Sequence, residues 1–188
     1  MSKTLILVLF AMMCLAQLVA PASMIYQREA TLAHGETFKF RTAPVDPYDA
    51  FRGRYVALGY QQGTVSGAWS DDGFRRGRVV YATLERDAEG FAQVTTVSRN
   101  RPDAPHYLKA RIRWASRDQL MLDLPFDRYY MGEFDAPAAE REFLWRQGRQ
   151  ERSAYAVTRV RRGFGVIEEL MVEDQPIREW LLSQDGKQ

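Results

Sequence analysis

Cysteine is nearly absent from this chain of 188 residues, since Cys14 is the only one and it lies in an apolar segment. Disulfide bonds and cysteine-ligated zinc sites need at least two cysteines, so neither is expected. The two histidines, His34 and His106, are far apart in the sequence and have no neighbouring histidine. We expect both to be solvated side chains, and we predict no metal site and no cofactor.

The chain also lacks an excess of charge of one sign. Its 26 lysines and arginines oppose 24 aspartates and glutamates, and the net charge is +2. The two signs are dispersed along the sequence. A protein that follows the phosphates of a nucleic acid needs a larger, one-sided basic excess. We therefore predict no nucleic-acid partner.

The longest stretch without charge lies between Lys3 and Arg28, which have no charged side chain between them. A helix needs roughly 20 apolar residues to cross the hydrocarbon core of a bilayer. We predict that residues 1–27 form an N-terminal transmembrane anchor, with residues 5–26 in lipid. Tyr26 suits the headgroup level, where aromatic rings gather.

A cleaved secretory signal is the alternative interpretation of this segment. Ala20-Pro21-Ala22 supplies the small residues that a cleavage site needs. The apolar residues continue past Pro21 to Tyr26, however, which is longer than a signal peptide requires, so the length favours an uncleaved anchor. Lys3 and the α-amino group precede the helix and place the N-terminus in the cytoplasm. We thus predict a single-pass protein of the inner (cytoplasmic) membrane, with residues 28–188 as one exported domain that is periplasmic or otherwise extracytoplasmic.

Alternating apolar and polar residues predict antiparallel strands in that domain. Three hairpins are expected, with turns at residues 87–90, 116–118 and 162–163. Short strands at this spacing are typical of a barrel or a sandwich, so the predicted fold is mainly β with one or two helices. The predicted strands span residues 37–41, 55–61, 78–85, 91–97, 108–114, 120–124, 153–161 and 165–172.

Two helical features are expected outside the membrane segment. The apolar helix is predicted to continue a little beyond Arg28 and to stop at Gly35. A second helix is predicted over residues 138–147, because Asp135 is a good N-cap and Pro137 fits the first turn.

The most unusual stretch spans residues 41–60. Asp46-Pro47 predicts an extended residue before a turn, and Asp49 is suited to accept hydrogen bonds from that turn. Gly53 allows a backbone conformation that a side chain disfavours. Arg52 is placed to pair with either aspartate. A strand follows, with Val56, Leu58 and Tyr60 expected on one face.

This stretch resembles the GDYxxLxY family of bacterial membrane-anchored proteins. The matching residues are Asp46-Pro47, Asp49, Arg52-Gly53, Tyr55, Leu58 and Tyr60. A second block at residues 126–133 also looks like that family, and Arg54 stands where its motif has an aspartate. The resemblance covers nearly the whole chain. It implies a membrane anchor, an exported domain and a multi-pass membrane partner, with no established activity.

The chemistry of the two blocks leaves two interpretations open. Asp46, Asp49, Asp127 and Glu133 beside Arg52 and Arg128 are able to form an acid/base site, because close charges shift one another's pKa. The same residues also suit turn caps and salt bridges. The tyrosines either pack in the core or line a groove that binds peptide or carbohydrate. A signal-peptidase-like mechanism is excluded, because Pro44 stands where its nucleophilic serine is needed.

We predict a non-enzymatic accessory or interaction module for an integral membrane partner, and we assign no catalytic residue. An envelope hydrolase, or a domain that binds a small ligand or glycan through clustered carboxylates and tyrosines, is the alternative. The predicted binding residues are Asp46, Asp49, Arg52, Gly53, Tyr55, Tyr60, Arg128, Tyr129, Tyr130 and Glu133.

Overall fold

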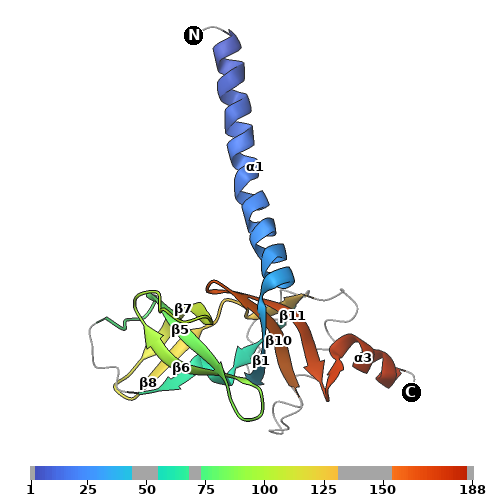
Figure 1. Ribbon diagram of the computed structural model, residues 1–188. Coiled ribbons are helices and arrows are strands. Elements are labelled where there is room, and N and C mark those ends of the chain that lie inside the picture. The colour runs from blue at the N-terminus through green and yellow to red at the C-terminus, as the bar shows by residue number, and fades with distance from the viewer. Residues whose placement is uncertain (1–2, 44–54, 68–72, 131–153, 186–188) are drawn as a thin grey trace.

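A long helix, α1, stands on a β-rich body in the computed structural model (Figure 1). The structure describes residues 3–43, 55–67, 73–130 and 154–185. Helix α1 (Lys3–His34) has 32 residues, so its length is about 48 Å at 1.5 Å per residue. It is long and apolar enough to cross a membrane, and none of its most apolar 18-residue window is buried.

Helix α1 ends at Gly35, as the sequence predicts. The Gly35 amide donates a hydrogen bond to the Thr31 carbonyl over 2.8 Å. A Cβ at Gly35 would collide with that same carbonyl oxygen and would lie 3.0 Å from the Cβ of Arg159. Glycine therefore lets α1 meet the sheet closely and pass into the first strand without a linker.

The first sheet follows α1 directly. It contains β1 (Glu36–Ala43) and the hairpin of β10 (Ala154–Arg161) and β11 (Phe164–Val172). The short strands β3 (Gly59–Tyr60) and β12 (Gln175–Pro176) complete the order β12-β11-β10-β1-β3. The last turns of α1 contact β10 and β11, so the foot of the helix rests on this sheet.

The second sheet has the order β4-β8-β7-β5-β6. Two of the predicted hairpins form it, and the β10–β11 hairpin is the third, so all three are confirmed. Its strands are β4 (Thr64–Ser66), β5 (Val79–Arg86), β6 (Ala92–Ser98), β7 (Tyr107–Ala115) and β8 (Gln119–Asp123). The described residues thus confirm a mainly β fold with antiparallel sheets.

Two parallel bridges join the sheets, Lys39 with Phe91 and Leu108 with Gly163. They bring the two sheets together around one apolar core. The largest fully buried side chains come from both sheets and include Phe38, Phe40, Val80, Leu108, Ile112, Leu120 and Leu170. The core therefore needs both sheets to be in place.

The prediction of a single strand over residues 55–61 is wrong. This segment forms β2 (Tyr55–Ala57), which pairs with β9 (Arg128–Tyr130), and then β3, which joins the first sheet. The break lies at Leu58, whose amide donates to the Asp127 carbonyl over 2.9 Å and whose side chain is buried. The 3-10 turn η1 (Gln61–Gly63) then leads to β4.

The helix α3 (Ile177–Asp185) is absent from the predicted elements, although its sequence carries a helical signal. Ile177 and Trp180 are buried and Leu181 is half-buried, at the spacing i, i+3, i+4 of an amphipathic helix. The predicted helix over residues 138–147 lies outside the described residues.

Candidate functional site

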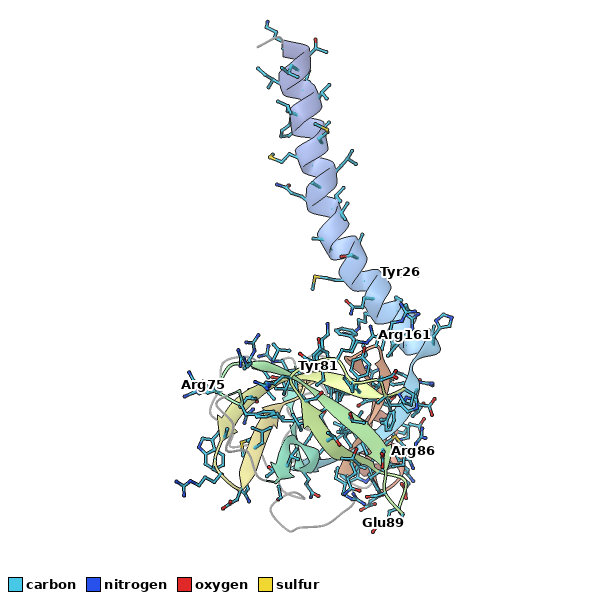
Figure 2. All side chains as sticks on the ribbon, turned by 60° about the vertical axis from the view of Figure 1, so that its left-hand side comes forward. Tyr26, Arg75, Tyr81, Arg86, Glu89 and Arg161 are labelled. Atoms are coloured by element: carbon cyan, nitrogen blue, oxygen red, sulfur yellow. The ribbon has the colours of Figure 1, made fainter. Side chains whose placement is uncertain are left out.

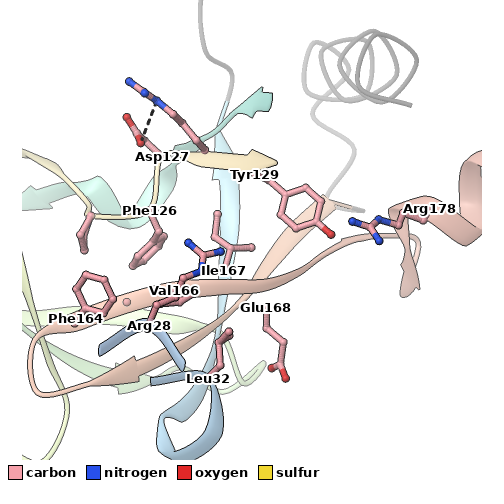
Figure 3. Close-up of a pocket in the computed structure, with 13 residues that line it drawn as sticks. Arg28, Leu32, Phe126, Asp127, Tyr129, Phe164, Val166, Ile167, Glu168 and Arg178 are labelled. Atoms are coloured by element: carbon pink, nitrogen blue, oxygen red, sulfur yellow. Dashed lines mark ion pairs between the residues drawn. The ribbon is translucent and has the colours of Figure 1, made fainter. Parts of the chain in front are cut away.

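A pocket of about 620 Å³ lies at the foot of α1 (Figure 3). Four elements enclose it: the last turns of α1, the segment that leads into β9, the first half of β11, and α3. Its lining residues are Arg28, Leu32, Pro125, Phe126, Asp127, Arg128, Tyr129, Phe164, Gly165, Val166, Ile167, Glu168 and Arg178.

The apolar part of the pocket is built around Phe126. Its ring packs edge-on against Phe40 and Tyr60, with ring centroids 5.0 and 5.2 Å away. A Cβ at Gly165 would lie only 2.5 Å from two atoms of the Phe126 ring, so the ring lies directly on the backbone of β11. These contacts connect this part of the pocket to the core and hold its shape.

The polar part of the pocket carries both signs of charge. The Nε of Arg128 lies 3.6 Å from an oxygen of Asp127, the ion pair drawn in Figure 3. The Glu168 carboxylate accepts hydrogen bonds from Arg159 over 2.7 and 3.0 Å. Arg28 forms no ion pair with another residue in the described ranges. An anionic group entering the pocket would therefore meet an unneutralised cation beside α1.

Tyr129 contributes a phenol to the lining of the pocket. It is buried, and its hydroxyl donates to Oε1 of Glu169 over 2.7 Å. Burial, followed by this hydrogen bond, raises the pKa of the Tyr129 phenol to about 12, and the nearby Arg178 opposes the rise. Tyr129 therefore acts as a neutral hydrogen-bond donor throughout the physiological pH range.

Replacing Tyr129 by phenylalanine should make the free energy of unfolding fall less steeply as the pH rises above 10. Because the folded-state pKa is raised, the stabilisation by the neutral phenol is complete below pH 10 and is lost between pH 10 and about 12. Its slope there is up to about 1.4 kcal/mol per pH unit. We expect Tyr129→Phe to cost about 1.5–3 kcal/mol at pH 8, as for hydrogen bonds to charged groups, and less as the pH rises. Urea unfolding at several pH values measures both quantities, and parallel curves would contradict the assignment.

Tyr60 does not line the pocket. Its hydroxyl donates to the Phe126 carbonyl over 2.8 Å, and its ring also packs against Phe40 at 5.8 Å. Burial raises the pKa of the Tyr60 phenol well above its ordinary value. Of the two interpretations of the tyrosines, core packing is the one that the surroundings of Tyr60 support.

Strand pairing brings the two sequence blocks together. In the β2–β9 ladder Tyr55 faces Tyr130 and Ala57 faces Arg128. Arg128 and Tyr129 also line the pocket, which places part of the predicted surface there. The predicted site residues Asp46, Asp49, Arg52, Gly53 and Glu133 lie outside the described residues, so the carboxylate cluster stays a prediction.

Sequence reasoning missed the lining residues that come from α1, β11 and α3. Arg28 and Leu32 read as an ordinary extension of the membrane helix, and residues 164–168 read as a strand. Arg178 belongs to a helix that was not predicted. No short motif connects these segments, because tertiary folding alone places them around one pocket.

Comparison with known proteins identifies one family. A family model described as "GDYXXLXY protein" matches residues 17–170. No curated protein matches the chain, and neither does any solved structure. The match covers most of the chain and includes both sequence blocks and the whole of β2 and β9. The chain therefore belongs to the GDYXXLXY family.

Proposed function

We propose that this protein is a single-pass protein of the cytoplasmic membrane, whose periplasmic domain is a non-enzymatic accessory module for an integral membrane partner. The observation that carries the proposal is the position of the pocket. Arg28 and Leu32 of α1 form part of its lining. A protein that lies beside α1 in the bilayer would therefore have its extramembrane loops next to the pocket.

The surface of α1 supports insertion in the membrane. Large apolar side chains from Leu5 to Tyr26 are exposed, and burying such surface away from water is favourable. The β body covers only the end of the helix, where Thr31 is buried. The rest of α1 needs an apolar surrounding, which a bilayer and a neighbouring transmembrane helix both supply.

The chemistry of the pocket suits a peptide loop. Leu32, Pro125 and Phe164 offer apolar surface, while Arg28 and Arg178 offer positive charge at the same opening. Interfaces of this kind combine an apolar centre with a polar rim. A loop that carries an apolar side chain beside a carboxylate would complement both parts.

Cross-linking followed by affinity purification from detergent-solubilised native membranes tests the proposal. We expect the tagged full-length chain to recover one multi-pass protein in stoichiometric amount. Arg178→Glu reverses a charge at the pocket, and it should lower the recovery at least ten-fold, which corresponds to about 1.4 kcal/mol of binding free energy. Arg117→Glu makes the same change on the exposed β7–β8 turn and should leave recovery unchanged. Equal recovery with both variants would contradict the proposal.

A small-ligand binding domain is the second candidate, and the size of the pocket favours it. Small-molecule sites usually measure about 300–1,000 Å³, and this pocket falls in that range. Native mass spectrometry of the purified full-length chain would detect a bound molecule, and Arg178→Glu should remove an anionic one. Turnover of a substrate that is abolished in Asp49→Asn would instead support the envelope hydrolase.

A further inference from the structure

We propose that the β body itself docks on anionic phospholipid headgroups through a basic face on its α1 side. This inference rests on the proposed insertion of α1 in the bilayer. The basic face is defined by Arg75, Arg101, Lys109, Arg111, Arg161 and Arg162. Figure 2 shows Arg75, Tyr81 and Arg161 on the side of the body that faces α1, and Glu89 on the opposite side.

Strand pairing gathers these cations from separate parts of the sequence. In the β5–β7 ladder Tyr81 faces Lys109 and Val79 faces Arg111, so all four side chains share the outer surface of the second sheet. The Lys109 amide donates to the Gly163 carbonyl over 2.8 Å. This hydrogen bond places Arg162, in the turn between β10 and β11, and Arg161, at the end of β10, beside β7.

Few carboxylates neutralise the basic face. Arg111 donates to the Gly77 carbonyl over 2.7 Å, and the Arg101 guanidinium lies 5.4 Å from the centroid of the Tyr107 ring. Within the described part of the chain, Lys109, Arg161 and Arg162 form no ion pair. Asp123 faces Arg111 in the β7–β8 ladder, and its carboxylate pairs with Arg113.

The opposite side of the body shows a different pattern. There Arg41 pairs with Asp87 over 2.8 Å and with Glu89 over 2.9 Å, and Arg86 pairs with Glu36. The arginines on that side are therefore matched by acids, whereas on the basic face Arg111 donates to a carbonyl and Arg101 lies over an aromatic ring. The body is electrostatically two-sided even though its net charge is small.

The height of the body above the membrane brings the basic face to the headgroups. The uncharged part of α1 ends at Gln27, and Gly35 follows eight residues later, which is about 12 Å along the helix. The headgroup region extends about 5–8 Å beyond the hydrocarbon core. The face therefore lies within roughly one Debye length, about 10 Å, of the phosphates.

The composition of the face fits this occupant. Val79 is 45% exposed at its centre and Tyr81 is half-buried beside it, and tyrosine rings favour the membrane interface. Each basic residue near an anionic surface raises the affinity about five-fold. A peptide or nucleic acid would have to enter the narrow space between the face and the bilayer, whereas the lipids are already there.

Energy transfer to lipid headgroups tests the inference with the full-length chain. A donor dye is attached to Val79→Cys in a Cys14→Ser background, and the chain is reconstituted in vesicles that carry an acceptor on the headgroup. We expect transfer in vesicles with 30% phosphatidylglycerol to be at least twice that in pure phosphatidylcholine, and the excess to disappear in 0.5 M NaCl. A dye at Glu89→Cys, on the far side, should show no such difference.

Charge removal provides the matched control. Lys109→Gln combined with Arg111→Gln and Arg161→Gln should abolish the excess transfer. Lys39→Gln combined with Arg86→Gln and Arg117→Gln removes the same charge elsewhere and should retain it. Near-ultraviolet circular dichroism checks that both variants are folded, and the single change Lys109→Gln, with an expected partial loss, replaces the triple variant if it is not.

The outcomes separate this inference from the proposed function. Equal, salt-independent transfer in both lipids, with the chain still retained after a carbonate wash, would overturn the docking of the face and leave the membrane anchor standing. Release of the chain by carbonate would overturn both. Retention together with lipid-dependent transfer supports both the membrane anchor and the docking of the face.

Discussion

Phe40→Ala should lower the free energy of unfolding by about 3–5 kcal/mol, the range for phenylalanines removed from well-packed cores. Phe40 is fully buried in β1, and its ring contacts Tyr60 and Phe126 edge-on. Removing the ring leaves a cavity between the first sheet and the segment that leads into β9. That segment is unable to move inward freely, because Phe126 already lies against Gly165.

Denaturant unfolding of the full-length chain in detergent micelles measures this effect. Leu182→Ala is the control, because that side chain is 73% exposed on α3 and its loss should change stability by no more than about 0.5 kcal/mol. Phe40→Ala should also weaken ligand or partner binding, since Phe126 shapes the pocket. A change in stability below about 1 kcal/mol would contradict the assignment of this aromatic cluster as the link between pocket and core.

The double change Leu15→Arg and Leu18→Arg should release the protein from the membrane. An arginine at the centre of a membrane helix costs about 2.5–3.5 kcal/mol, so the two together cost about 5–7 kcal/mol. Both leucines are about two-thirds exposed, at 64% and 65%, and lie far along α1 from the β body. Stability of the body should therefore be unchanged while membrane retention is lost.

Carbonate extraction of cell membranes measures the retained fraction. Leu15→Ile with Leu18→Ile is the matched control and should be retained like the original chain. Peptide mapping of the mature protein provides the complementary measurement. A chain that begins at or next to Met1 supports the uncleaved anchor, whereas one that begins after Ala22 would show that the segment is a signal peptide.

The hairpins were predictable from sequence because their signals are local. In β7, Leu108, Ala110 and Ile112 are buried and alternate with exposed Lys109 and Arg111, which is the pattern that period-2 alternation predicts. The end of α1 was also predictable from the sequence, because a single glycine, Gly35, determines where the helix stops. These features depend on neighbours within a few residues, and pattern analysis reads such neighbours directly.

The break at Leu58 was not predictable from pattern alone. Val56, Leu58 and Tyr60 alternate as a continuous strand would, but Leu58 instead takes its backbone partner from Asp127. The choice between one strand and two depends on a segment nearly seventy residues away. Tertiary pairing overrides the local preference there.

The pocket and the basic face were not predictable from the sequence, for the same reason. Arg28, Phe126 and Arg178 come together only because α1, the β9 segment and α3 meet on β11. The cations of the basic face are likewise dispersed in sequence, and the near-zero net charge conceals them. The uneven distribution of charge over the body depends on how the strands are arranged, so the amino-acid composition does not reveal it.

The direct passage from α1 into β1 has a mechanical consequence. Gly35 is the only residue between the helix and the strand, so no flexible linker separates them (Figure 1). Strand β1 pairs with β10 over six residue pairs, from Glu36 to Arg41. A force applied along α1 therefore loads that ladder in shear, so that all its hydrogen bonds resist at once. If the helix tilts in the bilayer, the β body would rotate with it as one rigid unit.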